Sequence, residues 1–452
     1  MAATEFAAID EQRFRAFHWR ATLTTGLGVF CDGYDLSSIG LVLTLVLASF
    51  GHTAVISAAS GALTAAALVG SAVGALLFGV LGQKGRKRFY GYDVLILGVA
   101  AIAQAFAPNL PWLIGIRFAL GIGVGADYVL SPTIMAEHAN RADRGRALGL
   151  GFGTMWPIGA VTAALVLLVL KALGVSPDLQ WRIVLAGGAI PAFSVLYFRR
   201  RMPETARYLA KLAGDAVEAG AVMTQIAGRQ TAAPARDDRS FWTVFAAHAR
   251  PILSAALLWM IYDLVVYFSV LFGPSVIAKS VGLSPAGFTL LLELVFLIPT
   301  SVLFSVFLID RIGRKALQGW GFFVGAIMVT VFAAMQHQIA TAPVLGFAVF
   351  GLFNLASTGP GIVSGAGILG VELAPTRIRS VAQSITVAAG RIGAATSGYG
   401  FPWLISHIGQ AGAYYVIGLL GLLGALCTWL LVPETGRISL EAINREESPA
   451  PA

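Results

Sequence analysis

Twelve long apolar blocks leave this chain few folds other than a bundle of membrane-crossing helices. They run from 21–50 near one end of the sequence to 411–431 near the other, and the third, 92–106, is the shortest. A helix rises about 1.5 Å per residue, so about 20 apolar residues cross the roughly 30 Å hydrocarbon core of a bilayer. Only 12% of the residues are charged, against about 25% in a soluble domain. The sequence therefore predicts an all-α membrane protein with twelve transmembrane helices.

The two halves of the chain repeat one another, with three motifs recurring in the same order about 230 residues apart. They are Gly-Arg-Lys at 85–87 and 313–315, Pro-Glu-Thr at 203–205 and 433–435, and a glutamate seven positions before an arginine, at Glu137 and Arg144 and at Glu372 and Arg379. Such repeats predict two pseudo-symmetric six-helix bundles with a site near the midplane between them. The expected parts are an N-terminal bundle at 1–198, a cytoplasmic inter-bundle loop at 199–249, a C-terminal bundle at 250–432 and a cytoplasmic tail at 433–452.

The positive charges follow the topology of a membrane protein. A pI near 9.7 is also compatible with nucleic-acid binding, but the Lys and Arg residues lie in the termini or in alternate loops. The exceptions are Arg117, Lys171, Arg182, Lys279 and Arg391. By the positive-inside rule both termini are cytoplasmic. We therefore expect a multi-pass protein of the cell (inner) membrane, with the lipid bilayer and no nucleic acid as a partner.

Carboxylates inside the apolar blocks are the strongest signal of function. A charged side chain at the bilayer centre costs about 3 kcal/mol on insertion scales, so it usually serves a cavity or a partner. Asp32 and Asp35 share one helix face, roughly 18 Å from the cytoplasmic end of the first block, and the fourth block adds Asp127. Burial and mutual repulsion make all three candidates for proton binding. The alternative is a structural ion pair with Arg117 or Arg391.

The seventh block carries a second polar face. Trp259, Asp263 and Tyr267 are spaced four residues apart and therefore lie on one side of a helix, with Asp263 at a depth matching that of the first-block carboxylates. This face predicts a substrate contact, the alternative being ordinary aromatic packing. Glu293, in the eighth block, is isolated, and a functional role and a buried hydrogen bond remain equal alternatives for it.

Acid and base residues at the predicted cytoplasmic face indicate a gate. Basic residues alone are expected there from topology, but the paired acids favour ion pairs that hold one arrangement of the bundles. The gate candidates are Lys84, Arg86, Glu137, Arg144, Asp310, Arg311, Arg314, Glu372 and Arg379.

Four features of the sequence resemble the major facilitator superfamily. They are Asp-Gly-Tyr-Asp at 32–35, the glycine-rich run ending in Asp-Tyr-Val-Leu-Ser at 127–131, the loops with Gly-Arg-Lys, and the Pro-Glu-Thr sequences. Within it, the 127–131 run and the face of Trp259, Asp263 and Tyr267 resemble the phosphate:proton symporters. That resemblance implies proton movement through Asp32, Asp35 and Asp127, and phosphate contacts from Tyr128, Trp259, Asp263 and Tyr267. The chain also looks related to sugar porters, and its 32–35 motif resembles the aromatic acid:proton symporters.

The chain departs from the phosphate symporter pattern at two polar ligands. The fifth-helix glutamine has no counterpart in 154–157, and the tenth-helix asparagine has none in 359–363, although Asn354 lies nearby. The first Gly-Arg-Lys loop also carries Gln83 where the superfamily usually has aspartate. A site lined by aromatic side chains would accept a larger, partly apolar anion such as an organic or aromatic acid. The candidate substrate contacts are Tyr128, Trp156, Trp259, Asp263, Tyr267 and Arg391.

We therefore expect a proton-coupled symporter that imports phosphate or an organic acid by alternating access between the bundles, as a monomer. A symporter for sugars or other solutes and an efflux pump are the alternatives, and a non-transporting sensor lacks a large enough loop. An enzyme is not expected, because the sequence offers no nucleophile with its base, no metal-ligand spacing and no cofactor motif.

Overall fold

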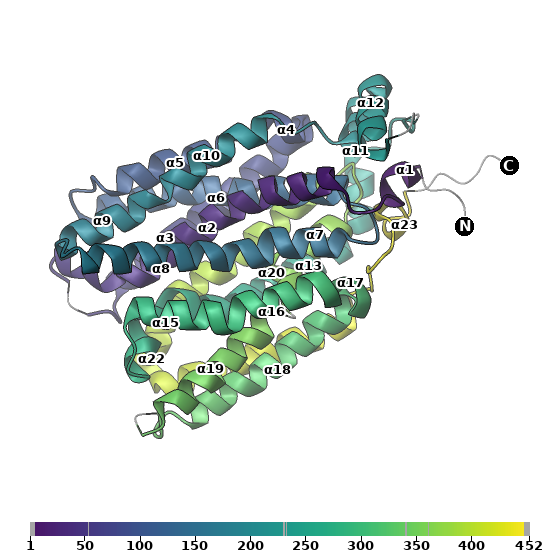
Figure 1. The fold of residues 1–452 in the computed structure, drawn as a ribbon. Coiled ribbons are helices and arrows are strands. Elements are labelled where there is room, and N and C mark those ends of the chain that lie inside the picture. The colour runs from purple at the N-terminus through teal and green to yellow at the C-terminus, as the bar shows by residue number, and fades with distance from the viewer. Residues whose placement is uncertain are drawn as a thin grey trace.

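The computed structural model describes residues 5–52, 54–228, 231, 233–339, 341–359 and 361–446. These residues form helices and connecting turns, without a strand. The long helices run roughly side by side, and the first and last described helices, α1 (Ala7–Asp10) and α23 (Leu440–Ile443), lie at the same end of the bundle (Figure 1). This end also carries the short helices α11 (Ala206–Tyr208) and α12 (Ala216–Ala227). We call it the terminal face, and we call the other end of the bundle the opposite face.

The N-terminal half contributes six crossing segments. They are α2 (Ala16–Ser49), α3 (Ala58–Leu81), α5 (Tyr92–Gln104), α6 (Leu110–His138), α7 (Arg144–Leu148) continued through the π-helical η2 (Gly149–Thr154) into α8 (Met155–Ala172), and α9 (Pro177–Gly187) continued into α10 (Ala189–Arg200). The short η1 (Gly82–Lys84) and α4 (Arg86–Phe89) connect α3 to α5.

The C-terminal half contributes six more. The first consists of α13 (Phe241–Phe272), η4 (Gly273–Ile277) and α14 (Ala278–Ser280), and the second of α15 (Pro285–Leu291), η5 (Leu292–Leu297), α16 (Ile298–Leu303), η6 (Phe304–Leu308) and α17 (Ile309–Ile312). The third is α18 (Arg314–Ala334), and the fourth consists of α19 (Pro343–Thr358), α20 (Ile362–Gly365) and α21 (Ile368–Glu372). The last two are the two parts of α22 (Arg379–Leu431). The break in α22 falls at Gly409, whose φ of 75° is not helical.

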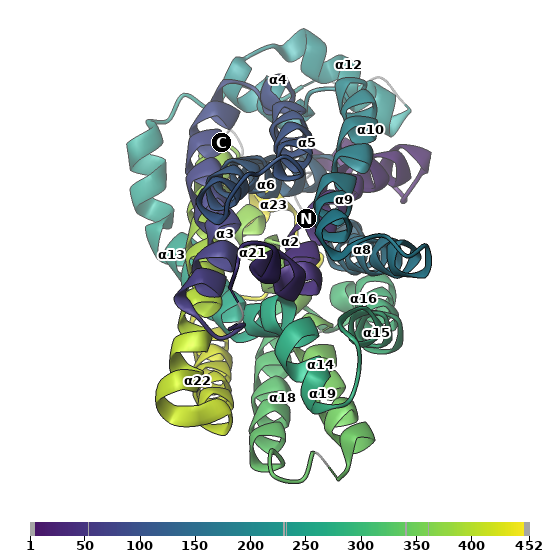
Figure 2. The same ribbon diagram turned by 90° about the vertical axis from the view of Figure 1, so that its left-hand side faces the viewer.

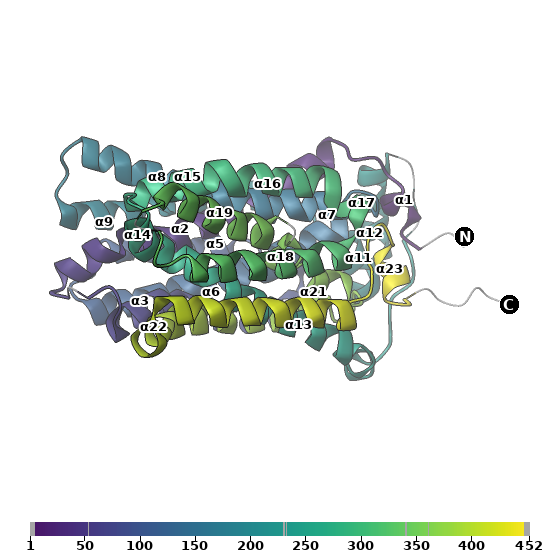
Figure 3. The same ribbon diagram turned by 90° about the horizontal axis from the view of Figure 1, so that it is seen from below.

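Nine helical stretches of the described residues are long and apolar enough to cross a membrane. The broken α22 supplies two crossings, and the shorter α5 and α19 complete the expected twelve. The two halves form separate groups of helices when the bundle is viewed from the opposite face (Figure 2), and their long helices share one axis direction when it is viewed from below (Figure 3). The prediction of an all-α fold with two six-helix bundles is confirmed.

Small residues allow the helices to approach closely. A Cβ atom added to Gly70 of α3 would lie 2.0 Å from the carbonyl oxygen of Phe118, and one added to Gly125 of α6 would lie 1.9 Å from that of Ser71. Lipid gives apolar side chains little reason to associate, so close backbone contact of this kind is a main source of helix packing. The glycine-rich run in α6 therefore serves helix packing.

The terminal face is covered by short helices on which the two ends of the chain meet. They are α1 (Ala7–Asp10), α11 (Ala206–Tyr208), the π-helical η3 (Leu209–Ala213), α12 (Ala216–Ala227) and α23 (Leu440–Ile443). The buried Arg207 guanidinium lies 2.8 Å from the Asp10 carboxylate and 2.7 Å from that of Glu441. Burial raises the pKa of Asp10. Burial acts in the same direction on Glu441, but the Arg207 charge outweighs it and lowers the pKa of Glu441 to about 2.

The predicted part boundaries remain predictions, and the structure gives the helix ends near them. Helix α10 ends at Arg200 and α13 begins at Phe241, inside the expected loop at 199–249. The last six residues of the expected tail at 433–452, and the first four of the expected N-terminal bundle, lie outside the described residues.

We predict that Glu441→Gln loosens the C-terminal segment, because Arg207 loses a charge-assisted hydrogen bond worth about 1.5–3 kcal/mol. The expected results are a lower melting temperature of the purified protein and faster tryptic cleavage near Arg437. A carboxylate with a lowered pKa stabilises the fold above its unfolded pKa, and this stabilisation is lost as pH falls toward 2. The difference from the wild type should therefore be constant between about pH 5 and pH 8.

The matched control is Glu11→Gln, which removes an exposed ion pair with Arg141 at 4.0 Å and should change little. Equal melting temperatures for Glu441→Gln and the wild type would contradict the prediction.

Candidate functional site: a charged gate and a central cavity

Two buried glutamates hold the bundles together near the terminal face. Glu137 of α6 accepts hydrogen bonds from Arg86 at 3.3 Å and from Arg379 at 3.0 Å, and another from the Thr205 hydroxyl. Arg86 belongs to the same half as Glu137, whereas Arg379 opens α22 in the other half. The Glu137 carboxylate therefore binds one arginine from each bundle.

The second glutamate repeats this arrangement from the other bundle. Glu372 of α21 lies 2.8 Å from Arg144 of α7 and 3.0 Å from Arg314 of α18, and the Thr435 hydroxyl donates to it at 2.5 Å. Because Arg144 belongs to the N-terminal bundle, its ion pair with Glu372 joins the two bundles. The repeated motifs of the sequence thus form two symmetric sets of ion pairs, each of which joins the two bundles. The two glutamates and the four arginines that bind them, Arg86, Arg144, Arg314 and Arg379, are buried.

Asp310 adds a third connection between the bundles. Its carboxylate accepts from the backbone N–H groups of Gly145 at 3.1 Å and Arg146 at 2.7 Å, and pairs with Arg314 at 2.7 Å. Lys84 and Arg311 are exposed and form no ion pair with any described residue. Seven of the nine gate candidates are therefore brought together, and these two are not.

A second charged cluster lies within the N-terminal bundle. The Arg199 guanidinium of α10 lies 2.7 Å from the Asp127 carboxylate and also pairs with Asp93 of α5, while the Ser131 hydroxyl donates to Asp127. The ring of Tyr90 lies 4.1 Å from the Arg199 guanidinium carbon. Asp127 is therefore ion-paired through Arg199, and not through Arg117 or Arg391.

Asp32 and Asp35 are buried without such a partner. Neither carboxylate oxygen of either residue has a hydrogen-bond partner among the described residues. Asp32 lies within electrostatic reach of Asp127, Arg391 and Arg199. Asp32 therefore interacts electrostatically with the Arg199 cluster and with Arg391 of the cavity described next. Asp35 lies in the field of Arg117, which donates its own hydrogen bond to Gln104 at 3.1 Å.

Gly28 lets α2 approach the Arg199 cluster. A Cβ atom there would lie 1.8 Å from an Arg199 terminal nitrogen and 2.3 Å from an Asp127 oxygen. A side chain at this position would separate the carboxylates of α2 from those of α6.

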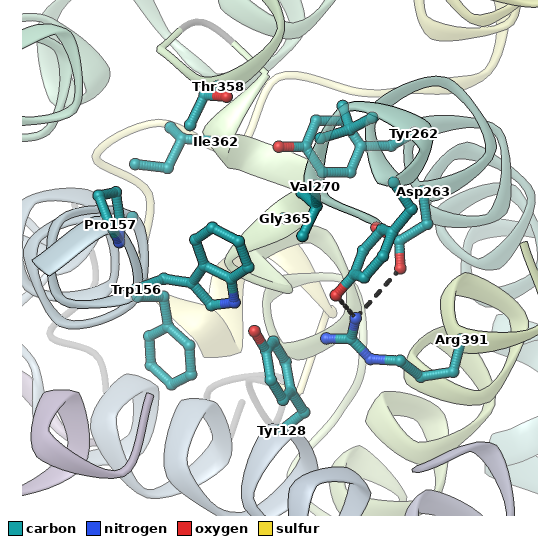
Figure 4. Close-up of a pocket in the computed structure, with 14 residues that line it drawn as sticks. Tyr128, Trp156, Pro157, Tyr262, Asp263, Val270, Thr358, Ile362, Gly365 and Arg391 are labelled. Carbon is teal, nitrogen blue, oxygen red and sulfur yellow. Dashed lines mark hydrogen bonds and ion pairs between the residues drawn. The ribbon is translucent and has the colours of Figure 1, made fainter. Parts of the chain in front are cut away.

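A central cavity with a volume of about 70 Å³ lies between the bundles. Aromatic side chains from both halves form much of its wall, and Tyr128, Trp156, Tyr262 and Arg391 point into a common space (Figure 4). Its lining residues are Tyr128, Phe152, Gly153, Trp156, Pro157, Tyr262, Asp263, Val266, Tyr267, Val270, Thr358, Ile362, Gly365 and Arg391.

Arg391 is the cation of this cavity. Its guanidinium donates to the Tyr267 hydroxyl and, at 3.4 Å, to the Asp263 carboxylate (Figure 4). It also lies over the Tyr128 ring, with 4.0 Å between guanidinium carbon and ring centroid. A buried guanidinium flanked by hydroxyls can bind an oxyanion in fixed geometry, and the carboxylate beside it can accept a hydrogen bond from the same ligand.

The predicted substrate contacts meet at this cavity with one difference. Tyr128, Trp156, Asp263, Tyr267 and Arg391 line it. The Trp259 side chain lies behind the wall, its ring centroid 6.2 Å from that of Tyr128. It packs on Gly367 and Gly390, where an added Cβ would lie 2.9 Å and 2.5 Å from the indole.

The sequence reasoning missed Arg199, Asp93 and Tyr262. Arg199 directly follows an apolar block and was counted with the inter-bundle loop, although it ends as a fully buried side chain. The sequence did offer a signal for Arg199: it stands at the end of an apolar block in the half of the chain whose apolar blocks carry Asp32, Asp35 and Asp127. Asp93 lies in the short third block, and an acid there carried the same signal as Asp32.

The comparisons with known proteins agree with this architecture. Residues 21–446 match the family model described as "Sugar (and other) transporter". "Probable inorganic phosphate transporter 1-6" of Arabidopsis thaliana is 30% identical over 98% of this chain and 96% of its own length. "Low affinity inorganic phosphate transporter 4" of Lotus japonicus is 30% identical over 99% and 95%.

Solved structures share the fold. The proton:xylose symporter XylE bound to 6-bromo-6-deoxy-D-glucose superposes with a TM-score of 0.78, at 22% identity over 95% of this chain and 99% of that one. The human organic anion transporter MFSD10 superposes with a TM-score of 0.63, at 14% identity over 91% and 99%.

The fold is therefore that of the major facilitator superfamily, and the matching family and relatives make this chain a multi-pass membrane transporter of small molecules and not an enzyme. The chain belongs to the Sugar (and other) transporter family.

We predict that Glu372→Gln opens the terminal face, because Arg144 and Arg314 keep their charge and lose their carboxylate. Removing one partner of a buried ion pair costs about 3–5 kcal/mol. Spin labels on cysteines at the exposed positions Lys84 and Arg311, in a chain without Cys31 and Cys427, should show longer distances between the bundles.

Asp178→Asn is the control, since it removes an ion pair with Arg182 that lies at the opposite face with the Asp178 side chain about half exposed. An unchanged distance distribution in Glu372→Gln would exclude these pairs as the gate.

Proposed function

We propose that this protein imports inorganic phosphate together with protons. The observation that carries the proposal is the Arg391 guanidinium beside the Asp263 carboxylate in the wall of the central cavity. The family membership and the full-length similarity to proteins named inorganic phosphate transporters support it.

The pair of opposite charges suits dihydrogen phosphate in particular. Its charged oxygens accept hydrogen bonds from Arg391 and from tyrosine hydroxyls, while its P–OH groups donate to Asp263. A fully deprotonated oxyanion would meet the Asp263 carboxylate with no hydrogen to share, and like charges repel in a buried site. The site should therefore select an oxyanion that keeps a proton.

An organic or aromatic acid is the second candidate. Trp156 lies in the wall, and residues 154–157 include no glutamine to match the fifth-helix glutamine of the phosphate symporters. Asn354 lies outside this cavity, where its side-chain oxygen accepts from Ser269 at 2.8 Å. These differences favour a ligand with an apolar part, and a comparison of anions decides between the two candidates.

Asp32 is proposed as the principal proton carrier. It is buried, unpaired among the described residues, and within electrostatic reach of both Asp127 and Arg391. Protonation of Asp32 would remove a negative charge that competes with the anion for Arg391, so proton and substrate would favour each other's binding. Asp35 and Asp127 with Arg199 would pass the proton along the same helices.

The terminal face is proposed to be the cytoplasmic side of a cell (inner) membrane. Basic side chains of its loops, such as Lys87, Arg88, Arg200 and Arg201, support this orientation by the positive-inside rule. With the cross-bundle pairs formed, the cavity would be closed to the cytoplasm, and rocking of the bundles would release both ligands there. One chain lines the whole cavity, so a monomer should suffice.

We predict that unlabelled phosphate and arsenate compete with labelled phosphate for uptake into proteoliposomes, whereas sulfate competes more than about 10²-fold less well. Sulfate lacks a hydroxyl at neutral pH, and a site built to hydrogen-bond a hydroxyl rejects ligands without one strongly. Asp263→Asn should weaken this discrimination, because its amide can donate to sulfate. Uptake of an aromatic acid with no phosphate competition would favour the second candidate.

We predict that Asp32→Asn strongly lowers accumulation driven by an inward pH gradient but retains exchange of internal for external phosphate. Exchange requires only that the two bundles move between their arrangements with phosphate bound, whereas accumulation also requires a group that binds and then releases a proton. Full gradient-driven accumulation by Asp32→Asn would exclude Asp32 as the carrier, and retained exchange would show that the variant is folded.

A further inference from the structure

A second, smaller chamber lies between the bundles, on the side of the central cavity toward the opposite face. It has a volume of about 20 Å³, room for about one water molecule, and shares Val270 with the central cavity. Ser37 of α2 faces it from the N-terminal bundle, and Ser269, Thr289, Glu293 and Asn354 face it from the C-terminal bundle. Ser37 follows Asp35 by two residues, a spacing at which two helical side chains face different sides, and Asp35 does not line this chamber.

Glu293 is the one acid of this chamber, and it has no ionic partner among the described residues. It is 5% exposed, and one of its carboxylate oxygens has no hydrogen bond. It lies in the π-helical η5, which packs against α8, α15, α16 and α19. These four helices carry one charged side chain, Lys171, which is exposed near the end of α8.

The other charges of the neighbouring helices face elsewhere. On α13, Asp263 faces Arg391 in the central cavity, and on α2, Asp35 lies in the field of Arg117. A carboxylate buried with no cation beside it is costly to hold in its charged form. Glu293 must therefore be neutralised by something that enters the chamber.

The remaining polar groups indicate what that is. The Ser269 hydroxyl donates to Asn354 at 2.8 Å, the Asn354 amide to the Phe350 carbonyl at 2.9 Å, and the Thr289 hydroxyl to the Pro285 carbonyl at 3.1 Å. Ca²⁺ takes about 6–8 oxygen ligands, and the described residues contain no group of three or more His, Cys, Asp or Glu side chains that could hold a metal ion. A proton needs one carboxylate oxygen, and the protonated group could then donate to the unpartnered Ser37 hydroxyl.

We propose that Glu293 is a second proton-binding site, located in the C-terminal bundle and loaded from the opposite face through this chamber. The step is a proton transfer from water to the carboxylate and, after the bundles rock, from the carboxyl group back to water. No other bond changes. This inference rests on proton-coupled transport, and it gives the C-terminal bundle a proton carrier of its own beside the α2 carboxylates.

The first test uses purified protein and no substrate. The infrared carbonyl band of a protonated carboxylic acid should be present in the wild type at pH 7, be lost in Glu293→Gln and return in Glu293→Asp. It should shift in D₂O and disappear as pH rises. Absence of a Glu293 band, or a band that neither exchanges in D₂O nor titrates, would overturn the proposal even if the transported substrate is not phosphate.

The second test measures coupling. One pH unit corresponds to a tenfold factor for each proton carried. With an inward gradient of one unit and no membrane potential, Glu293→Gln should therefore reach a phosphate accumulation ratio about tenfold lower than the wild type, with exchange retained. Asp178→Asn is the matched control. An unchanged ratio would overturn the proposal, and if Glu293→Gln also loses exchange, the infrared result decides.

Discussion

The cost of burying charge in an apolar bundle is the constraint on which this structure depends. A lone charge inside a membrane costs several kcal/mol, so each buried charge must be paired, neutralised by a proton or matched by a ligand. The protein uses all three solutions at different depths. Pairs lie at the terminal face, a mixed cluster lies around Arg199, and unpartnered carboxylates lie nearer the middle.

Because the paired and the unpartnered charges lie at different depths of the same bundle, the gate at the terminal face is connected to the central cavity. The ion pairs of Glu137 with Arg379 and of Glu372 with Arg144 join the two bundles, so an arrangement that separates these residues must make up the free energy of the lost pairs. A protonated carboxylate and a bound anion can supply that free energy, because each removes an unfavourable charge from the interior. The aromatic wall around Arg391 keeps water away and strengthens these electrostatic effects.

Much of the fold could be predicted because membrane helices have a simple signature. The length of each apolar block predicted a membrane-crossing helix, and the repeated motifs predicted the division into two bundles. The break inside α22 at Gly409 and the π-helical turns η2, η5 and η6 could not be predicted, because they depend on how a helix packs against its neighbours. The carboxylates at Asp32, Asp35, Asp127 and Asp263 were found because any acid in an apolar block is unusual.

The sequence by itself determined which residues carry charge into the membrane and that the two halves match. Only the tertiary structure decided which charges meet, because many ion pairs join residues far apart in the sequence, as in Arg391 with Asp263 and Arg379 with Glu137. It gave Asp127 the partner Arg199, left Asp32 without one among the described residues, and put Trp259 behind the cavity wall. Helix spacing defines the face of one helix, and the packing of all twelve defines what that face contacts.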